Sequence, residues 1–297
     1  METQWYKQMV KTLQLNGKAE RTQEAYVRAL RMLVEFYGKS PDLLTEEELQ
    51  DYFLHRKNVS RWSPKTMRIC YCGIRFFYQN VLQRNWHILN ILRAQNEHRL
   101  PTVLSVEEVR RILGCVKTPH NYTFLSTVYS CGLRLQEALH LEVSDIQSQR
   151  MLIHVHRGKG AKDRYVPLPH STLGLLRRHW ATHRNPTLIF PAQGRNGKGA
   201  SARQTPMAKT SVQGALRRAI GEAGIHKRQV SIHTLRHCGV YPATGGTTHL
   251  LEAGVNLRAI QKYMGHAQLE TTMVYLHLTS KGHEDAFQLI DNVMEAL

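Results

Sequence analysis

The feature that most constrains the fold is the helical spacing of apolar residues over the first third of the chain. In the segment RTQEAYVRALRMLVEFYG, apolar residues recur every three or four positions, and Gly38 ends the pattern. Residues with this spacing share one face of an α-helix, and glycine commonly follows a last helical turn. Residues 1–95 are therefore predicted to form an all-helical domain. The apolar face of this segment carries Tyr26, Leu30, Leu33, Val34 and Tyr37.

Capping boxes mark two further helix starts, and the second opens a new domain. A Ser or Thr three residues before a Glu lets each side chain accept a hydrogen bond from the other residue's backbone N–H. Thr45 and Glu48 form one such pair, and Ser105 and Glu108 form the next. Residues 96–104, NEHRLPTVL, lack periodicity and contain a proline, which predicts a linker between two domains.

Within the second domain, residues 105–297, the helical period gives way once to a strand period. MLIHVHRGKGAKDRYVPL is typical of a strand, a glycine-rich turn and a second strand, which together form a β-hairpin. Gly132 interrupts the helical run before it, and helices resume near 170–183, near 210–223 and from 231. The expected fold class is mainly α with a small β-sheet (α+β).

Charge narrows the class of partner. The chain has 40 Lys and Arg against 23 Asp and Glu, a formal net charge of +17. Such an excess attracts polyanions and favours nucleic acid, although lysines on solvated faces would give the same count. On the helix expected after Ser63, the residues Lys65, Arg68 and Arg75 are either phosphate contacts or part of a solvated face.

Other class markers are missing from the sequence. The start METQWYKQMVKTLQ is polar, and no apolar run approaches the ~20 residues of a membrane span. A P-loop and a carboxylate cluster for magnesium are not evident. The cysteines have no zinc-finger spacing and no disulfide framework, which favours a reducing compartment and a soluble, intracellular protein. They are Cys70, Cys72, Cys115, Cys131 and Cys238.

A His-x-x-Arg pair stands at an expected helix start, in HTLRH. At positions i and i+3, His233 and Arg236 share a helix face and can converge on one phosphate, but a structural helix-start histidine explains His233 equally well. A second copy, His154 with Arg157, lies on an expected strand. Side chains at i and i+3 of a strand point to opposite faces, so this copy is set aside.

Further residues carry possible chemistry. Arg134 stands at a helix start near apolar residues, where it either pairs with Glu137 or faces a ligand phosphate. Lys159, between glycines in the hairpin turn, is either a solvated turn lysine or a mobile proton donor. His266 follows a helix-closing glycine, and Tyr275 lies on an expected new helix, where a lone tyrosine usually belongs to the core.

Taken in order, these residues and their flanks resemble the tyrosine recombinase (phage integrase) family. The matching blocks are GLRLQEAL, GKGAKDRYVPL, HTLRH and THLLEAGVNLRAIQKYMGHAQLETTMVY, with RTQEAY and SPKTMR in the first domain. The resemblance covers essentially the whole chain and is closest to the Xer and transposon-integrase branch. It implies a helical SAM-like core-binding domain, which binds DNA, over residues 1–95. A mixed α/β catalytic domain with a C-terminal tail helix then follows over residues 105–297.

The resemblance also implies a reaction. Tyr275 would attack a DNA phosphodiester to give a 3′-phosphotyrosyl link and a free 5′-hydroxyl. Arg134 and Arg236 would bind the non-bridging oxygens as charge develops on the phosphorus centre. Cleavage and rejoining of strands would make the protein a site-specific recombinase or integrase.

The remaining family positions supply proton transfer and positive charge. By resemblance, Lys159 protonates the leaving 5′-oxygen, His233 assists proton movement at the tyrosine, and His266 hydrogen-bonds the phosphate. These groups would take the place that a metal ion has in other phosphoryl-transfer enzymes, so no metal ligand and no cofactor is expected. The covalent link conserves the phosphodiester energy, so ATP is not needed.

The family implies an assembly on DNA. The expected partner is double-stranded DNA with a specific recombination site, bound by a homo-tetramer that works through a Holliday junction and is a monomer when free. The expected location is cytoplasmic and nucleoid-associated, without a membrane partner. The tail SKGHEDAFQLIDNVMEAL would dock on a neighbouring protomer or pack locally.

Two alternatives remain beside this interpretation. A type IB topoisomerase uses similar residues, but the Xer-like first domain and the compact second domain argue against it. The other is a catalytically impaired relative that only binds DNA, because an insertion at 239–247, around GVYPATGG, interrupts the helix behind HTLRH. Proline and paired glycines do not continue a helix. An insertion that bulges outward costs little loop entropy, so His233 and Arg236 are expected to keep their places.

Overall fold

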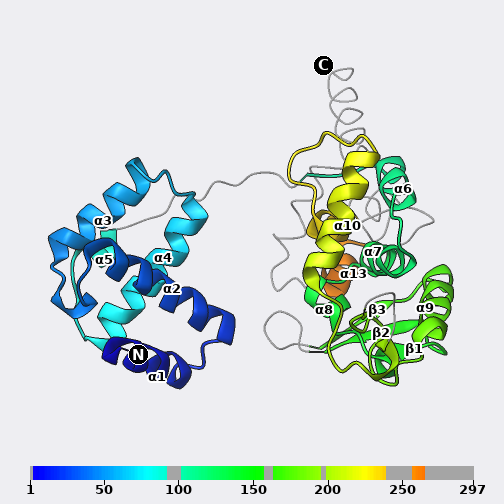
Figure 1. Ribbon diagram of the computed structural model, residues 1–297, viewed down its shortest axis with the longest axis horizontal. Helices are drawn as coiled ribbons and strands as arrows, with labels where there is room; N and C mark the ends of the chain where they lie inside the picture. Colours follow the sequence, from blue (N-terminus) through cyan, green and yellow to red (C-terminus); the bar gives the residue numbers. More distant parts are fainter. Residues whose placement is uncertain (1–2, 92–101, 157–162, 195–198, 239–255, 265–297) are drawn as a thin grey trace, which may run out of the picture. The chain divides into compact units, whose positions relative to one another are not determined.

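The computed structural model describes most of the chain, in two compact units. The units are Met1–Arg99 and Leu100–Leu297, and each is described by itself. The described part is mostly helical with one small three-stranded sheet, which confirms the predicted fold class (Figure 1). No helix within it is long and apolar enough to cross a membrane. The residues described are 3–91, 102–156, 163–194, 199–238 and 256–264.

The first unit is a bundle of helices around one apolar core. Helices α2 and α4 pack closely, and Gly73 makes this possible, since a Cβ there would stand 2.9 Å from the Tyr26 Cα. Leu30 and Leu33 of the predicted apolar face are fully buried. The elements are α1 (Gln4–Leu15), α2 (Glu20–Tyr37), η1 (Pro41–Leu43), α3 (Glu46–Asn58), α4 (Pro64–Phe76), η2 (Phe77–Val81) and α5 (Ile88–Ile91).

The predicted helix boundaries of this unit are confirmed. Gly38 ends α2 in the left-handed conformation, with φ +67°. The Thr45 hydroxyl accepts from the Glu48 N–H at 3.2 Å, while the Thr45 N–H donates to the Glu48 carboxylate at 2.8 Å. Ser63 caps α4, where its hydroxyl accepts from the Thr66 N–H at 3.2 Å. Local sequence signals therefore set where these helices begin and end.

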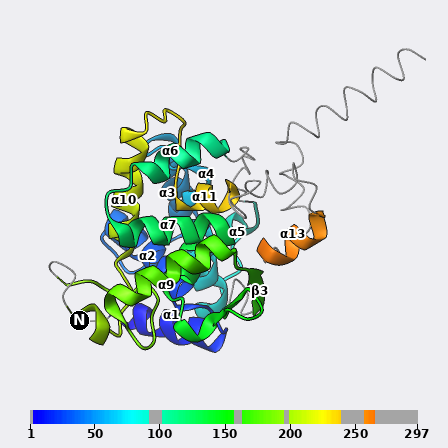
Figure 2. The same ribbon diagram turned by 90° about the vertical axis from the view of Figure 1, so that its right-hand side faces the viewer.

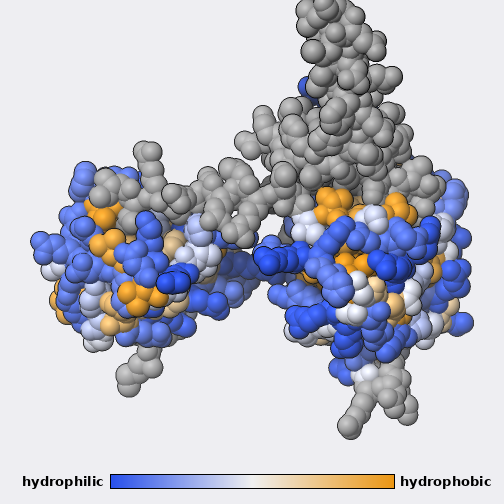
Figure 3. All heavy atoms as spheres, turned by 90° about the horizontal axis from the view of Figure 1, so that it is seen from above, coloured by the Kyte–Doolittle hydropathy of each residue, from blue (hydrophilic) through white to orange (hydrophobic). Residues whose placement is uncertain are grey.

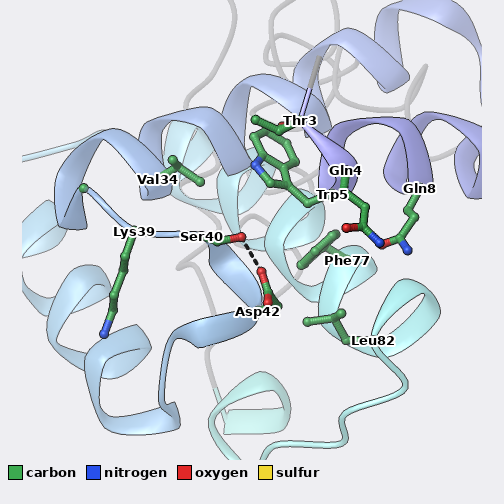
Figure 4. A pocket seen from close by; sticks show the side chains of 11 residues that line it. Thr3, Gln4, Trp5, Gln8, Val34, Lys39, Ser40, Asp42, Phe77 and Leu82 are labelled. Atoms are coloured by element: carbon green, nitrogen blue, oxygen red, sulfur yellow. Dashed lines mark hydrogen bonds between the residues drawn. The ribbon is translucent and has the colours of Figure 1, made fainter. Parts of the chain in front are cut away.

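A pocket of about 530 Å³ lies within the first unit, between α1, the end of α2, η1 and η2 (Figure 4). Trp5 and Phe77 contribute apolar walls, while Lys39 and Asp42 contribute charged groups. Lys39 pairs with Glu48 at 2.5 Å, and Asp42 accepts a hydrogen bond from the Ser40 hydroxyl. All of its lining residues belong to the first unit.

In the second unit the helices surround α7 (Figures 1 and 2). This helix contacts α6, α8, α9, α10 and α11, and every residue from Thr123 to Cys131 is buried. The sheet and α9 lie together at one end of the unit (Figure 1). The helices are α6 (Val106–Gly114), α7 (Pro119–Cys131), α8 (Leu135–Leu139), η3 (Val143–Asp145), α9 (His170–His183), η5 (Ala200–Ala202), α10 (Lys209–Glu222), α11 (Ile232–Cys238) and α13 (Leu257–Met264).

The predicted hairpin is present, with a third strand that the sequence did not predict. Strand β2 (Leu152–Val155) pairs antiparallel with β3 (Arg164–Pro167) on one side and with β1 (Ile146–Gln147) on the other. Across β2 and β3, His154 faces Tyr165 and Val155 faces Arg164. Along β3, Arg164 and Val166 are buried and Tyr165 is exposed. The sheet therefore presents one face to the core, as alternation requires.

Surface composition matches the excess of charged residues. Figure 3 shows hydrophilic side chains over much of the visible face of each unit, with smaller hydrophobic areas between them.

The Ser105–Glu108 capping box at the start of α6 is present, with hydrogen bonds of 3.1 and 2.7 Å. Its presence confirms the second predicted helix start.

Candidate active site

Arg134 lies where two helices of the second unit meet. Gly132 ends α7 with φ +62°, a conformation that favours glycine, and Arg134 is then the residue before α8. Its backbone N–H donates to Glu137 Oε2 at 2.7 Å, and its Nη1 donates to Glu137 Oε1 at 2.7 Å. The pairing with Glu137 that the sequence allowed is therefore real. It fixes the position of the guanidinium, whose side chain stays 23% exposed.

Arg236 reaches the same carboxylate from α11. This helix begins with a reciprocal cap, in which Ser231 and Thr234 each accept from the backbone N–H of the other at 3.3 and 3.0 Å. The Arg236 side chain is 1% exposed. Its Nη1 donates to the Gly132 carbonyl at 2.6 Å and lies 3.5 Å from Glu137 Oε2. The structure thus brings Arg134 and Arg236 together around Glu137.

Sequence reasoning missed a third arginine, Arg164, at the start of β3. Its Nη1 and Nη2 donate to the two Glu137 oxygens at 2.8 and 2.7 Å, and its Nε donates to the Tyr263 carbonyl of α13 at 3.0 Å. One guanidinium therefore joins the sheet, α8 and α13. A charged residue in step with Val166 and Leu168, on the apolar face of a predicted strand, was the available signal.

The electrostatics of this arginine cluster, Arg134, Arg164 and Arg236 around Glu137, favour an anion. Burial raises the pKa of Glu137, but hydrogen bonds and charge from Arg164, followed by hydrogen bonds from Arg134, outweigh it and lower the pKa to about 2. Both carboxylate oxygens are occupied by arginine donors. Among the described residues, three guanidiniums meet this one carboxylate, so positive groups outnumber negative ones there, and grouped guanidiniums are suited to binding phosphate.

His233 lies in a different environment from Arg236. Its side chain is exposed, whereas Arg236 is buried. The His233 ring packs edge-on against His237 on the next turn, with 4.3 Å between ring centroids. The shared helix face predicted for the His-x-x-Arg pair therefore combines a buried cation with an imidazole that solvent can reach.

The other predicted catalytic residues, Lys159, His266 and Tyr275, lie outside the described residues, as do the tail and the insertion at 239–247. Described elements precede or follow the segments that contain them. The segment with Lys159 connects β2 to β3, which begins with Arg164. Helix α13 ends at Met264, and α11 ends directly before the insertion. Elements of the arginine cluster thus precede or follow each of these segments in the chain.

The predicted DNA contacts lie on one helix of the first unit. Lys65, Arg68 and Arg75 are all exposed on α4. Spacings of three and ten residues place them on the same helix face. Arg75 donates to the Gln79 side chain at 2.9 Å and to the Tyr71 hydroxyl at 3.2 Å.

Comparisons with known proteins agree over nearly the whole chain. Residues 102–281 match the phage integrase family, and residues 5–88 match the phage integrase N-terminal SAM-like domain. The y4qK protein of Sinorhizobium fredii, named as an integrase/recombinase, is 34% identical over 92% of this chain and 83% of its own length. The tyrosine recombinase XerA of Thermococcus onnurineus is 31% identical over 95% of both chains.

Solved structures share the fold. A lambda integrase dimer bound to a core site superposes with a TM-score of 0.71 at 14% identity, covering 91% of this chain and 93% of the other. XerH bound to a palindromic difH substrate gives 0.66 at 22% identity, covering 91% and 80%. The family matches, the similarity to curated relatives and the arginine cluster lead to one conclusion: this chain belongs to the phage integrase family, the tyrosine recombinases.

Proposed function

We propose that this protein cleaves and rejoins DNA at a specific recombination site through a 3′-phosphotyrosyl intermediate, with Tyr275 as the nucleophile. The observation that carries the proposal is the arginine cluster, in which Arg134 and Arg236 are held on one carboxylate. Fixed guanidiniums stabilise developing charge without reorganising during the reaction. A scissile phosphate bound there would gain charge-assisted hydrogen bonds in its transition state.

The remaining roles follow the order of residues along the chain. Tyrosine has an ordinary pKa of about 10, so Tyr275 needs help to lose its proton near neutral pH. His233, whose side chain solvent can reach, would assist that proton transfer. Lys159 would protonate the leaving 5′-oxygen, and His266 would donate a hydrogen bond to the phosphate.

The DNA partner and the assembly belong to the same proposal. The formal net charge of +17 and the exposed Lys65, Arg68 and Arg75 on α4 suit a phosphate backbone. Related structures are described as bound to difH and to a core site. We infer a homo-tetramer on two duplexes that exchanges strands through a Holliday junction.

A second candidate function is DNA binding without cleavage, which the insertion at 239–247 favours. Against it, α11 is intact up to Cys238, whose Sγ accepts a hydrogen bond from the Leu104 N–H at 3.1 Å. Arg236 also keeps its contacts to Gly132 and Glu137. These contacts support an active enzyme, because they hold the arginine that the insertion would be expected to displace.

A nicked suicide substrate separates the two functions. A pool of nicked duplexes covering the DNA around the coding sequence is incubated with the protein, and covalent adducts are detected on a denaturing gel. We expect an adduct that disappears in Tyr275→Phe and persists in Tyr122→Phe, a matched change at a tyrosine that is 36% exposed on α7. Salt-sensitive DNA binding without any adduct would favour the binding protein instead.

Deletion of residues 239–245 then tests the insertion directly. If the insertion impairs catalysis, the deletion variant forms more adduct than the full chain. If the insertion bulges away from the site, both chains cleave at similar rates. Either rate is normalised to DNA binding measured by gel shift on the same duplex.

The α4 contacts are tested by the salt dependence of DNA binding. A substitution that removes one phosphate-binding side chain lowers the slope of log K against log salt by about 1. The triple variant Lys65→Ala, Arg68→Ala, Arg75→Ala removes three such side chains, so we expect its slope to be lower by about 3. A control that removes three other exposed lysines of the first unit should keep the wild-type slope. Its substitutions are Lys7→Ala, Lys11→Ala and Lys18→Ala.

A further inference from the structure

A second polar cluster lies on the sheet, apart from the residues that bind Glu137. Asp145 at the end of η3 and two histidines of the β2 region, His154 and His156, each offer one ligand atom, and these atoms lie within 4.8 Å of one another. His154 and His156 are two residues apart along an extended segment, so their side chains lie on the same face. We propose that this His-Asp cluster, Asp145, His154 and His156, binds a zinc ion.

The distances suit a common metal ion. Asp145 Oδ1 lies 2.7 Å from His156 Nε2. Zinc bonds to nitrogen and carboxylate oxygen are about 2.0–2.2 Å long, so two tetrahedral ligands stand about 3.3 Å apart. Small movements therefore open the 2.7 Å contact enough to admit the ion. Two imidazoles and a carboxylate are ligands that zinc prefers.

The environment of the Asp145 carboxylate favours the binding of a metal ion. The residue is 4% exposed, and its Oδ2 accepts from the Glu142 N–H at 2.9 Å. Its Oδ1 is buried and receives no hydrogen bond of ordinary geometry, although His156 lies beside it. A buried carboxylate oxygen without a hydrogen-bond donor is costly, and a metal ion removes that cost.

Neighbouring groups orient and neutralise the cluster. The His154 ring stacks on Tyr165, with 4.6 Å between centroids and 15° between planes, which restricts its rotation. Asp163 Oδ2 lies 3.5 Å from His154 Nε2 and 3.6 Å from His156 Nδ1. Asp163 thus places a second negative charge beside the ligands. Such outer carboxylates fix the histidine rings of metal sites.

A simple ion pair between Asp145 and a protonated His156 is the competing explanation. It accounts for the 2.7 Å contact, and Asp163 would pair with His154 in the same way at 3.5 Å, but it leaves the two histidine rings only 3.9 Å apart. Two imidazolium rings at that distance would repel each other, whereas two neutral imidazoles can share one cation. Zinc binding distinguishes the two explanations.

The proposed zinc site is adjacent in the chain to the segment that contains Lys159. His156 and Asp163 stand directly before and after residues 157–162, which contain Lys159. Zinc bound to His156, with Asp163 beside the ligands, would therefore hold the two described residues that flank this segment. On the proposed function, this steadies the general acid; the zinc site itself does not depend on that function.

The test is zinc binding by the full chain. Protein stripped with EDTA is titrated with zinc in competition with a chromophoric chelator. With 17 histidines in the chain, other weak sites are expected, so variants must identify this one. We expect the double variant His154→Gln, His156→Gln to lose one zinc per chain, with affinity lower by at least about 100-fold.

A matched control replaces two histidines elsewhere. His170 and His226 are both exposed, and the variant His170→Gln, His226→Gln should keep wild-type zinc affinity. Circular dichroism checks the fold of each variant. If the double variant does not fold, His156→Gln decides, because that side chain is 54% exposed; it should bind about 10-fold more weakly. Wild-type affinity and stoichiometry in either variant would overturn the proposal.

Discussion

Two buried carboxylates in the second unit are held alike but surrounded differently. Glu137 accepts from the backbone N–H of Arg134, and Asp145 accepts from that of Glu142, each three residues earlier. Around Glu137 stand three guanidiniums, whereas beside Asp145 stands an imidazole. Each carboxylate therefore anchors a polar cluster at the first turn of a short helix.

The difference in partners decides which ligand each cluster suits. Arginine is always charged and has no lone pair to offer, so the arginine cluster carries surplus positive charge and suits a phosphate. Neutral histidine has a free nitrogen lone pair, so the His-Asp cluster suits a cation. One capping arrangement thus serves two opposite binding preferences.

The largest expected effect is on stability in Glu137→Gln. Removing the charge leaves buried guanidiniums without their partner, which typically costs about 3–5 kcal/mol. Urea unfolding at pH 7 measures the loss. The control, Glu107→Gln, changes a carboxylate that is 62% exposed and should cost no more than about 0.5 kcal/mol. A loss as small as that of Glu107→Gln would show that Glu137 does not hold the arginine cluster together.

Lowering the pH should gradually remove the stabilisation that the Glu137 carboxylate provides. The folded-state pKa of Glu137 is lowered from 4.5 to about 2, so its stabilisation is fully present above pH 4.5 and is lost as the pH falls toward 2. A shift of this size corresponds to about 3 kcal/mol. The difference in unfolding free energy between wild type and Glu137→Gln should shrink over that range. A difference independent of pH would show that charge is not the cause.

Zinc should stabilise the protein through the His-Asp cluster and not through the arginine cluster. At about 100 times its dissociation constant, a ligand of the folded state alone adds about 2.7 kcal/mol to stability. Zinc should therefore raise the melting temperature of the wild type, and EDTA should reverse the rise. Asp145→Asn should show little response, while Glu137→Gln should respond like the wild type. An equal response in Asp145→Asn would place the zinc elsewhere.

A smaller loss is expected for Arg164→Lys. A lysine cannot bond both Glu137 oxygens and the Tyr263 carbonyl in one plane, so we expect a loss of about 2 kcal/mol. Arg150→Lys, at an exposed arginine near Tyr165, should change stability by less than about 0.5 kcal/mol. Equal stability of both variants would mean that the bidentate pair adds nothing.

Much of this fold was predictable from local signals. The capping boxes at Thr45 and Ser105, the helix ends at Gly38 and Gly132, and the β2–β3 hairpin all follow from short patterns. Each depends on a few neighbouring residues, so tertiary structure had little to override. The two-residue strand β1 (Ile146–Gln147) carries no such signal, and the sequence does not predict it.

The candidate site was predictable only in part. The pairing of Arg134 with Glu137 is a contact over three residues, which sequence spacing indicates. The contact of Arg236 with Gly132 spans 104 residues, and that of Arg164 with Tyr263 spans 99, so spacing could not predict either. His154 belongs to a chance copy of His-x-x-Arg, although His-x-His on a strand is a signal of its own. Chance patterns therefore need testing for more than one function.

Both clusters depend on the same register between β2 and β3, because side chains alternate along β3. Arg164 points to the core opposite Val155, and the next residue, Tyr165, lies outward opposite His154. A slip of one residue would turn every side chain of β3 to the other face. Arg164 would then lose its contacts with Glu137, and Tyr165 would lose its stacking on His154. Insertions between residues 156 and 163 are therefore tolerable only where the pairing of β2 with β3 keeps this register.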